Sequence, residues 1–382
     1  MSQLKDNEII IKHYKIKNVT YPKLVVFLSI TLVLLISLLF APLLEKMING
    51  SYYVLAKDGS EVNQNGLFVH YIDVGQGDAT LIELPDKKSV LIDCGTYSSN
   101  KLVRYIKNTR CKDKIDYFIL THNHNDHYGQ IKNIFENFEI GEIYRPNIYS
   151  TEIESVPGNI LYYGVDNSDA FKQVVSLIKK EESEGSVVNI ITQGDVIGGS
   201  ANSYSIEFIY CRDNTLESND FSPIMLLTYN GYKYIFSGDS TMENENAAAS
   251  LYQEKIEDCH VLKVGHHGSN TSSSKLYLDT LKAKYAVISV LEGSYSSVPS
   301  GEVIKRLVDS GISYDNILRT DRDGTIISFS TSSGEMKVSS INNLKTINNT
   351  VYIKWYYVVI IIFVVSTMIV FNKKIVVINL IK

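Results

Sequence analysis

Three histidines and one aspartate lie within six consecutive residues, in the order His122, Asn123, His124, Asn125, Asp126 and His127. Imidazole nitrogens and carboxylate oxygens are ligands that suit Zn²⁺, and such sites leave room for a water molecule. These side chains can meet at one ion only if the backbone that carries them turns tightly. A metal ion lowers the pKa of bound water from about 15.7 toward about 7, which makes hydroxide available at neutral pH. The cluster therefore predicts a metal-dependent hydrolytic site.

The elements that would position this cluster follow from the hydrophobic patterns of the chain. The apolar segment 116–122 is typical of a buried strand that ends in the His-rich loop, and 224–239 reads as a hairpin around Asn230-Gly231. Further strands are expected at 67–74, 79–85, 89–95, 204–210, 259–267, 285–290, 317–320 and 325–330, and helices at 99–108, 128–137, 168–183, 243–255, 273–283 and 300–310. Strands dominate early and then alternate with helices. This order favours an α/β sandwich of four layers, αββα, over one doubly wound sheet.

The His-rich loop after a strand resembles the HxHxDH motif of the metallo-β-lactamase fold superfamily. Four more motifs narrow the resemblance to the extracellular hydrolase domain of the ComEC/Rec2 DNA-uptake proteins and its free-standing relatives. These motifs are DVGQGDA at 73–79, LIDCG at 91–95, SGD at 237–239 and KVGHHGS at 263–269. The resemblance covers about residues 66–330, with the motifs in the same order. It implies a metallo-β-lactamase-like sandwich and a metal-dependent hydrolase, with a nuclease or phosphodiesterase as the first choice.

The resemblance also implies a set of six metal ligands, namely His122, His124, Asp126, His127, Asp239 and His267. The first two would hold one ion, and the next two would hold a second. Asp239 would bridge both ions because a carboxylate has two oxygens. The expected cofactor is Zn²⁺, as one or two ions, with Mn²⁺ as an alternative.

One departure from the superfamily concerns the first ion. Many members carry another histidine between the HxHxDH loop and the bridging aspartate, whereas no histidine lies between His127 and His260 in this chain. The first ion would therefore lack a ligand unless Asn219, Asp220 or water supplies it.

The adjacent residues His266 and His267 compete for one place beside the second ion. Side chains alternate along a strand, so only one of the two is expected to point inward. His267 is favoured as the ligand and His266 as a contact to the substrate, although the sequence leaves this choice open. The expected catalytic residues are Asp126, which would orient the attacking water, and His266. Asp93 would support the His-rich loop from behind, and the floor of the site would be shaped by Asp73, Gln76 and Asp78.

Two uncharged apolar segments, 24–44 and 355–371, flank this domain. The first is long enough to cross a bilayer as a helix, and the second is at the short end of that range. The alternatives are a buried helix or a cleaved signal peptide for the first and a buried β-hairpin for the second. Lysines before the first segment and after the second place both termini in the cytoplasm. The predicted order is a basic terminus 1–23, a span, a linker 45–65, an extracytoplasmic hydrolase domain 66–335, a linker 336–354, a second span and a basic tail 372–382.

The charge distribution bears on the substrate. The net charge is -5, and lysines gather at both ends, so the central domain is acidic and repels a polyanion at long range. Lys101, Arg104, Lys107 and Arg110 recur at every third residue, as a phosphate-tracking stripe or as a solvated helix face. We expect the membrane and DNA, or another phosphodiester polymer, as partners. The alternatives are a hydrolase of a cell-surface or small-molecule ester, such as a cell-wall polymer phosphodiester or a lactone, and a degenerate metal-binding module of a membrane complex.

The four cysteines are widely spaced and form no CxxC pair, which excludes a zinc ribbon. One or two disulfides remain open if the domain lies outside the cell.

Overall fold

The structure is a computed structural model that describes residues 66–97, 101–155, 164–198, 204–213, 215–291, 293, 298–331 and 334–340. The chain divides into two units, Met1–Asn63 and Gln64–Lys382, and every described residue belongs to the second. Both predicted membrane segments, 24–44 and 355–371, lie outside the described residues. Within those residues, no helix has the length and apolar character needed to cross a membrane.

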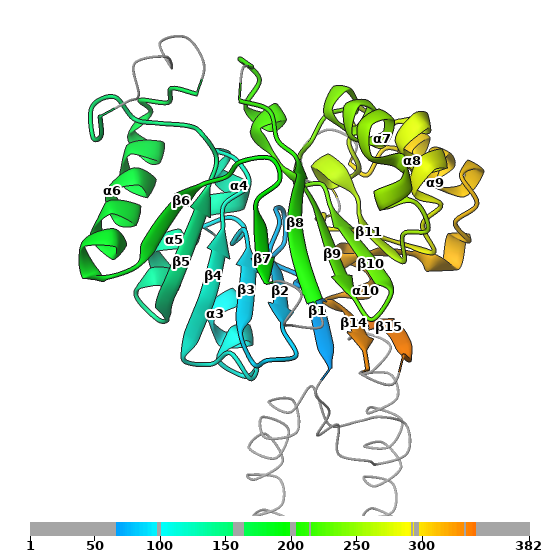
Figure 1. Ribbon diagram of the computed structural model, residues 1–382, viewed down its shortest axis with the longest axis horizontal. Helices are drawn as coiled ribbons and strands as arrows, with labels where there is room; N and C mark the ends of the chain where they lie inside the picture. Colours follow the sequence, from blue (N-terminus) through cyan, green and yellow to red (C-terminus); the bar gives the residue numbers. More distant parts are fainter. Residues whose placement is uncertain are drawn as a thin grey trace, which may run out of the picture. The chain divides into compact units, whose positions relative to one another are not determined.

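Two mixed β-sheets form the centre of the described unit (Figure 1). The first sheet has the strand order β15-β14-β1-β2-β3-β4-β5-β6, and its strands are β1 (Leu67–Tyr71), β2 (Thr80–Glu83), β3 (Ser89–Ile92), β4 (Lys114–Ile119), β5 (Glu139–Arg145), β6 (Val187–Ile190), β14 (Ile326–Ser330) and β15 (Met336–Ser340). Its strands run antiparallel from β15 to β3 and parallel from β3 to β6.

The second sheet has the strand order β13-β12-β11-β10-β9-β8-β7, and its strands are β7 (Val196–Gly198), β8 (Tyr204–Tyr210), β9 (Ile224–Tyr229), β10 (Tyr232–Phe236), β11 (Val261–Lys263), β12 (Tyr285–Ile288) and β13 (Ile317–Arg319). It repeats the division of the first sheet, because β7 to β10 are antiparallel and β10 to β13 are parallel. The β9–β10 hairpin turns at Asn230 and Gly231, whose φ angles are 49° and 82°. This is the left-handed geometry that the Asn-Gly pair predicts.

Helices cover the outer face of each sheet (Figure 1). Those beside the first sheet are α3 (Lys101–Ile106), α4 (Asn125–Tyr128), α5 (Ile131–Phe135) and α6 (Asp169–Glu184), and those beside the second are α7 (Met242–Ile256), α8 (Lys275–Leu281) and α9 (Gly301–Asp309). The short elements α10 (Thr320–Asp323), η1 (Ser218–Phe221), η2 (Gly265–Gly268) and η3 (Tyr314–Asn316) complete the described chain. The predicted α/β sandwich is therefore confirmed.

The period-2 pattern of the strands explains why the sheets are buried on both faces. On β10, Tyr234 and Phe236 pack into the core between the sheets, whereas Ile235 packs against the helices of the second sheet. On β4, Ile119 joins the core between the sheets and Phe118 joins the core under the helices of the first sheet. Each central strand is thus apolar at successive positions, which is the pattern that the sequence shows.

Two predicted boundaries are corrected. The helix expected at 99–108 ends at Ile106, and the strand expected at 259–267 is only β11, Val261–Lys263. All four cysteines have free thiols, and three of them are buried, so no disulfide joins them.

Candidate metal centre

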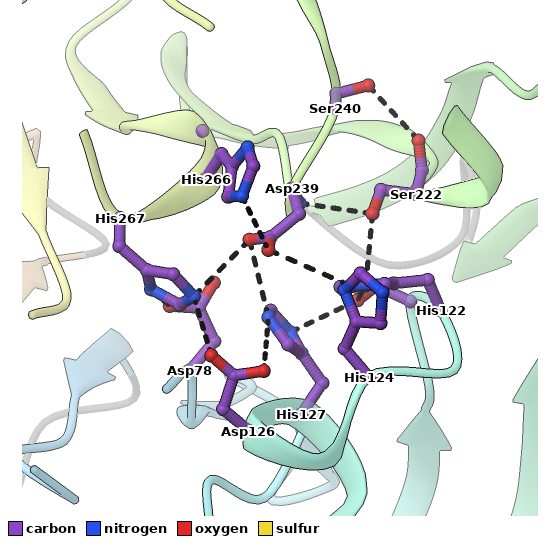
Figure 2. Close-up of polar contacts among 12 residues, drawn as sticks. Asp78, His122, His124, Asp126, His127, Ser222, Asp239, Ser240, His266 and His267 are labelled. Carbon is purple, nitrogen blue, oxygen red and sulfur yellow. Dashed lines mark hydrogen bonds and ion pairs between the residues drawn. The ribbon is translucent and has the colours of Figure 1, made fainter. Parts of the chain in front are cut away.

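The predicted site residues lie where strands from both sheets end at one edge of the sandwich (Figure 2). The His-rich loop follows β4 and leads into α4. Asp239 follows β10, and the two adjacent histidines follow β11 within η2. Because β10 and β11 are parallel neighbours, the loops after them emerge side by side. The other five predicted ligands gather around the carboxylate of Asp239 (Figure 2).

One group of side chains surrounds the Oδ1 oxygen of Asp239 and is called the inner cluster, defined as Asp126, His127, His267 and this oxygen. Nε2 of His127 lies 3.3 Å from Oδ1, and Nε2 of His267 lies 3.6 Å from it. The carboxylate of Asp126 is 3.2 Å from Nε2 of His267 and 4.0 Å from Nε2 of His127. Ligands of a tetrahedral Zn²⁺ at about 2.0–2.2 Å lie about 3.3–3.6 Å apart, so the distances of the two histidines from Oδ1 suit a shared ion.

A second group faces the Oδ2 oxygen of the same aspartate and is called the outer cluster, defined as His122, His124 and this oxygen of Asp239. Nε2 of His122 lies 3.7 Å from Oδ2 and 3.0 Å from Nδ1 of His124. Nε2 of His266 lies 3.8 Å from the same oxygen, although His266 is absent from the groups whose ligand atoms all lie within 4.8 Å of one another. The two oxygens of Asp239 thus serve two different groups of histidines.

Both His266 and His267 turn toward Asp239, which corrects the expectation that only one of them points inward. The expectation assumed a strand, where neighbouring side chains alternate. The backbone instead enters η2, with φ angles of 50° at His266 and 53° at His267. Left-handed conformations are uncommon for residues other than glycine. The adjacent histidines can face one carboxylate because this backbone abandons the alternation of a strand.

Buried polar atoms without a hydrogen-bond partner indicate that the inner cluster is suited to hold a cation. Among the described atoms, Nε2 of His127, Nε2 of His267 and Oδ1 of Asp239 are buried and have no hydrogen-bond partner. Buried polar groups are nearly always paired, and a lone pair without a partner costs free energy. Three lone-pair donors that converge at 3.3–3.6 Å fit a bound cation. The donor set of nitrogen and oxygen suits Zn²⁺ and also Mn²⁺.

Asp93 braces the His-rich loop, as the sequence predicts. Its Oδ2 accepts a hydrogen bond from the Nδ1 side of His127 at 2.7 Å and another from the hydroxyl of Thr121 at 2.8 Å. Its Oδ1 accepts the backbone N–H of Thr121 at 2.9 Å. This contact leaves Nε2 of His127 as the atom that faces Asp239.

Other supporting groups could not be read from the sequence. The Ser222 hydroxyl lies 3.2 Å from Nδ1 of His122 and accepts the backbone N–H of Asp239 at 3.0 Å. The backbone carbonyl of Ser289 lies 2.9 Å from Nδ1 of His267, and the Thr271 hydroxyl lies 2.9 Å from Nδ1 of His266. No sequence motif marks these serine, threonine and carbonyl groups, because only the tertiary fold brings them next to the histidines.

The loop that carries His266 and His267 is tied to helix α7. The buried carboxylate of Glu245 accepts the backbone N–H groups of Ser273 and Ser274 at 2.8 and 2.7 Å. Burial raises the pKa of Glu245 to about 7. No sequence motif marks this residue.

Asp220, one candidate for the missing ligand of the first ion, already has hydrogen-bond partners. Its carboxylate accepts hydrogen bonds from Arg212, Thr215 and Thr241. The side-chain oxygen of Asn219 is buried without a hydrogen-bond partner among the described atoms. Asn219 therefore stays a prediction as an additional ligand, whereas Asp220 serves the loop around η1.

The histidines of the site fall into two groups by the direction in which their pKa is shifted. Burial lowers the pKa of His122 and His266 below the ordinary value. Burial has the same tendency at His127 and His267, but Asp239 and the neighbouring carboxylates overcome it. They raise the pKa of His127 well above its ordinary value and that of His267 to about 10. The inner cluster therefore attracts positive charge, and protons compete there with a metal ion for the same atoms.

A pocket of about 210 Å³ opens over the two clusters, and it is lined by Gln76, His124, Asp126, Asp239, His266, His267, Ser269 and Val298. No lysine or arginine is among these described lining residues. The basic residues near α3 are used elsewhere: Arg110 pairs with the buried Glu83, and Nζ of Lys107 donates to Asn137 at 2.6 Å. Both lie beyond the end of α3 at Ile106, so the four basic residues do not share one helical face.

Comparison with known proteins supports this assignment of the fold. The model of the metallo-β-lactamase superfamily matches residues 72–207, which include the His-rich loop. Together with the two-sheet sandwich, this match confirms the resemblance to the metallo-β-lactamase fold superfamily. Among solved structures, the metallo-β-lactamase fold protein YhfI from Bacillus subtilis is similar at 12% identity and a TM-score of 0.41, over 72% of this chain and 100% of that one.

The resemblance to ComEC-type proteins is confirmed by curated relatives. ComE operon protein 3 of Bacillus subtilis is 25% identical over 68% of this chain, and Competence protein ComA of Neisseria gonorrhoeae is 23% identical over 69%. Recombination protein 2 of Haemophilus influenzae is 25% identical over 63%. The matched region spans only 32%, 32% and 26% of these three relatives, respectively.

Proposed function

We propose that the chain is a metal-dependent phosphodiesterase that cleaves DNA, with its catalytic domain outside the cell membrane. The observation that carries this proposal is the position of Asp239, whose two oxygens face two separate groups of histidines. The inner cluster would hold one ion and the outer cluster a second. When bound, such ions act as Lewis acids toward phosphoryl oxygens and lower the pKa of water.

Asp126 is proposed to orient the attacking water. Its carboxylate lines the pocket, and the neighbouring His267 and His127 hold its pKa well below the ordinary value despite burial. An ionised carboxylate at this place accepts a hydrogen bond from water and directs the lone pair of that water toward the substrate. The same carboxylate contacts His267 at 3.2 Å, which limits its freedom to rotate.

His266 is proposed to contact the substrate. It lines the pocket, its side chain is 26% exposed, and the Thr271 hydroxyl fixes its Nδ1 at 2.9 Å. Burial lowers its pKa, so the ring is neutral near pH 7. A neutral ring held in this way presents Nε2 to a phosphoryl oxygen or to a leaving group as a hydrogen-bonding partner.

The composition of the pocket supports a phosphodiester as the substrate. Without a lysine or arginine among the described lining residues, the charge of the substrate would be balanced by the two cation positions. Two cations placed side by side suit in-line displacement at phosphorus. Among the described lining residues there is no aromatic ring besides the histidines, so we expect recognition of the backbone rather than of a particular base. The names of the matched relatives, which refer to competence and recombination, agree with DNA.

The membrane placement rests on the sequence alone. We retain 24–44 and 355–371 as spans with both termini in the cytoplasm. Protease added to intact cells should then remove the central domain, and full protection of that domain would refute this topology.

The activity is tested with the full chain, loaded with Mn²⁺ or Zn²⁺ and assayed against DNA and a generic phosphodiester. We expect hydrolysis that is lost in Asp126→Ala and in metal-stripped protein, with the fold retained in both. Asp309→Ala is the matched control, because this exposed carboxylate on α9 pairs with Lys305 and, among the described residues, with no other cation. Unchanged turnover after metal removal would reject the proposal, and cleavage of the generic ester without DNA cleavage would redirect it to another phosphodiester.

A further inference from the structure

The motif KVGHHGS begins with a lysine that the proposed reaction does not use. Lys263 ends β11 and is only 2% exposed. Its Nζ lies 2.7 Å from Oδ2 of Asp78 and 2.9 Å from the carbonyl oxygen of Val264. Lysine is almost never fully buried unless it is paired. The carboxylate of Asp78 provides this pairing and makes the burial of Lys263 possible.

Asp78 comes from the motif DVGQGDA, and it is 4% exposed. Its Oδ1 lies 3.4 Å from Nδ1 of His267 and has no hydrogen bond within the described part of the structure. The backbone N–H of Asp78 donates to the carbonyl of Asp126 at 3.1 Å. This contact requires close approach, because a Cβ at the preceding Gly77 would lie 2.1 Å from the same carbonyl oxygen. Asp78 is thus fixed against the inner cluster by its backbone and side chain.

The ion pair of Lys263 and Asp78 matters for the balance of charges in the site. Four carboxylates lie within or beside the inner cluster, those of Asp78, Asp93, Asp126 and Asp239. Among the described residues, Lys263 is the one lysine or arginine that forms an ion pair with any of them. Without its ammonium group, the carboxylate of Asp78 would be buried beside three others with no lysine or arginine among the described residues to balance it.

We propose that Lys263 and Asp78 form a positioning pair that fixes His267 in the inner cluster. The inference rests on the proposed function, since it concerns how that site holds its metal. The Nδ1–H group of His267 donates to Ser289 at 2.9 Å, and the carboxylate of Asp78 stands behind the same atom at 3.4 Å. Nε2 is therefore directed at Asp126 and Asp239, at 3.2 and 3.6 Å. Lys263 holds Asp78 at the back of the imidazole.

The test separates this role from simple stabilisation of the fold. Asp78→Leu combined with Lys263→Met removes both buried charges, and an apolar pair of similar volume is commonly tolerated. We expect this double variant to melt close to the wild type but to bind Co²⁺ in the inner cluster 10- to 100-fold more weakly, as is typical when a group behind a ligand is lost. Asp78→Asn combined with Lys263→Met keeps an oxygen acceptor and should recover part of that affinity. Both are measured by calorimetric and spectroscopic Co²⁺ titration of the full chain.

The matched control is Arg145→Met combined with Glu154→Gln, which removes another ion pair, with Arg145 buried and Glu154 partly buried, whose contacts include none of the predicted ligands. We expect this control to bind Co²⁺ with wild-type affinity. Wild-type Co²⁺ affinity and spectrum in the Leu/Met double variant would overturn the positioning role and leave the proposed function intact. A wild-type chain that binds no Co²⁺ would overturn the proposed function, and this inference with it.

Discussion

The inner and outer clusters share Asp239 but differ in what stands behind their histidines. In the inner cluster, His127 is backed by the carboxylate of Asp93, and His267 by the carbonyl of Ser289 with Asp78 beside it. In the outer cluster, the described groups behind Nδ1 of His122 are the hydroxyls of Thr121 and Ser222. A carboxylate behind an imidazole raises its basicity and fixes its orientation more strongly than a neutral hydroxyl does.

The histidines of and beside the two clusters also differ in how exposed they are. His127 and His267 of the inner cluster and His122 of the outer cluster are buried, whereas His124 of the outer cluster and the neighbouring His266 are more exposed. We infer from this comparison that the inner cluster would hold one ion tightly, while the outer cluster would hold a second ion more weakly and meet the substrate. A protein with one strong and one weak position binds metal in two steps.

The largest effect is expected from Asp239→Ala, because both clusters lose an oxygen at once. We predict that both metal positions fail and that hydrolysis falls on the order of 10³-fold or more, which corresponds to several kcal/mol of lost transition-state stabilisation. Bound metal is counted by elemental analysis and turnover is measured on the same preparation. Two ions retained per chain would show that the clusters do not share this carboxylate.

Next in size is the difference between His267→Ala and His124→Ala. Loss of His267 should weaken the tighter step of metal binding by more than about 100-fold, above the effect typical of groups behind a ligand. Loss of His124 should leave the tighter step unchanged and remove only the weaker one. The two variants are compared by Co²⁺ titration. If both weaken the same step equally, the distinction between the clusters is wrong.

How far the sequence could anticipate this site depends on where each residue lies. The motif at 122–127 could be found because it follows an apolar segment whose strand character is visible in the pattern, whereas Asp239 and His267 are expected as ligands from the resemblance of the SGD and KVGHHGS motifs to the ComEC/Rec2 family. The Asn230-Gly231 pair predicts the hairpin whose second strand, β10, leads to Asp239. The expected spans at 24–44 and 355–371 lie outside the described residues and stay predictions.

The rest depended on tertiary contacts. That His266 and His267 both face Asp239 follows from a left-handed backbone that no local propensity of histidine predicts. Ser222 and Ser289 act through a hydroxyl and a carbonyl, groups that occur throughout any sequence. The spacing of Lys107 and Arg110 suggested one helical face, but the helix ends at Ile106 and Arg110 pairs with Glu83.

The smallest expected effect concerns Glu245, which braces the loop that serves both clusters. Burial raises its pKa from 4.5 to about 7, so the folded state favours the protonated form. The free energy of unfolding should therefore be highest below about pH 4.5 with respect to this group and fall as the pH rises toward 7, by at most about 3 kcal/mol. Glu245→Gln should remove this component, and Glu254→Gln, exposed on the same helix, should not. Thermal unfolding from pH 4.5 to 7.5 checks this, and identical pH profiles for wild type and Glu245→Gln would contradict it.

The central claim is that imidazoles and carboxylates from distant parts of the chain hold metal around Asp239. The most direct measurement is anomalous X-ray diffraction from crystals of the chain equilibrated with Zn²⁺ or Mn²⁺. We predict a strong peak among Oδ1 of Asp239, His127 and His267, with a weaker one between Oδ2 and His122. Anomalous density that lies elsewhere on the surface, with none beside Asp239, would contradict the proposed metal centre.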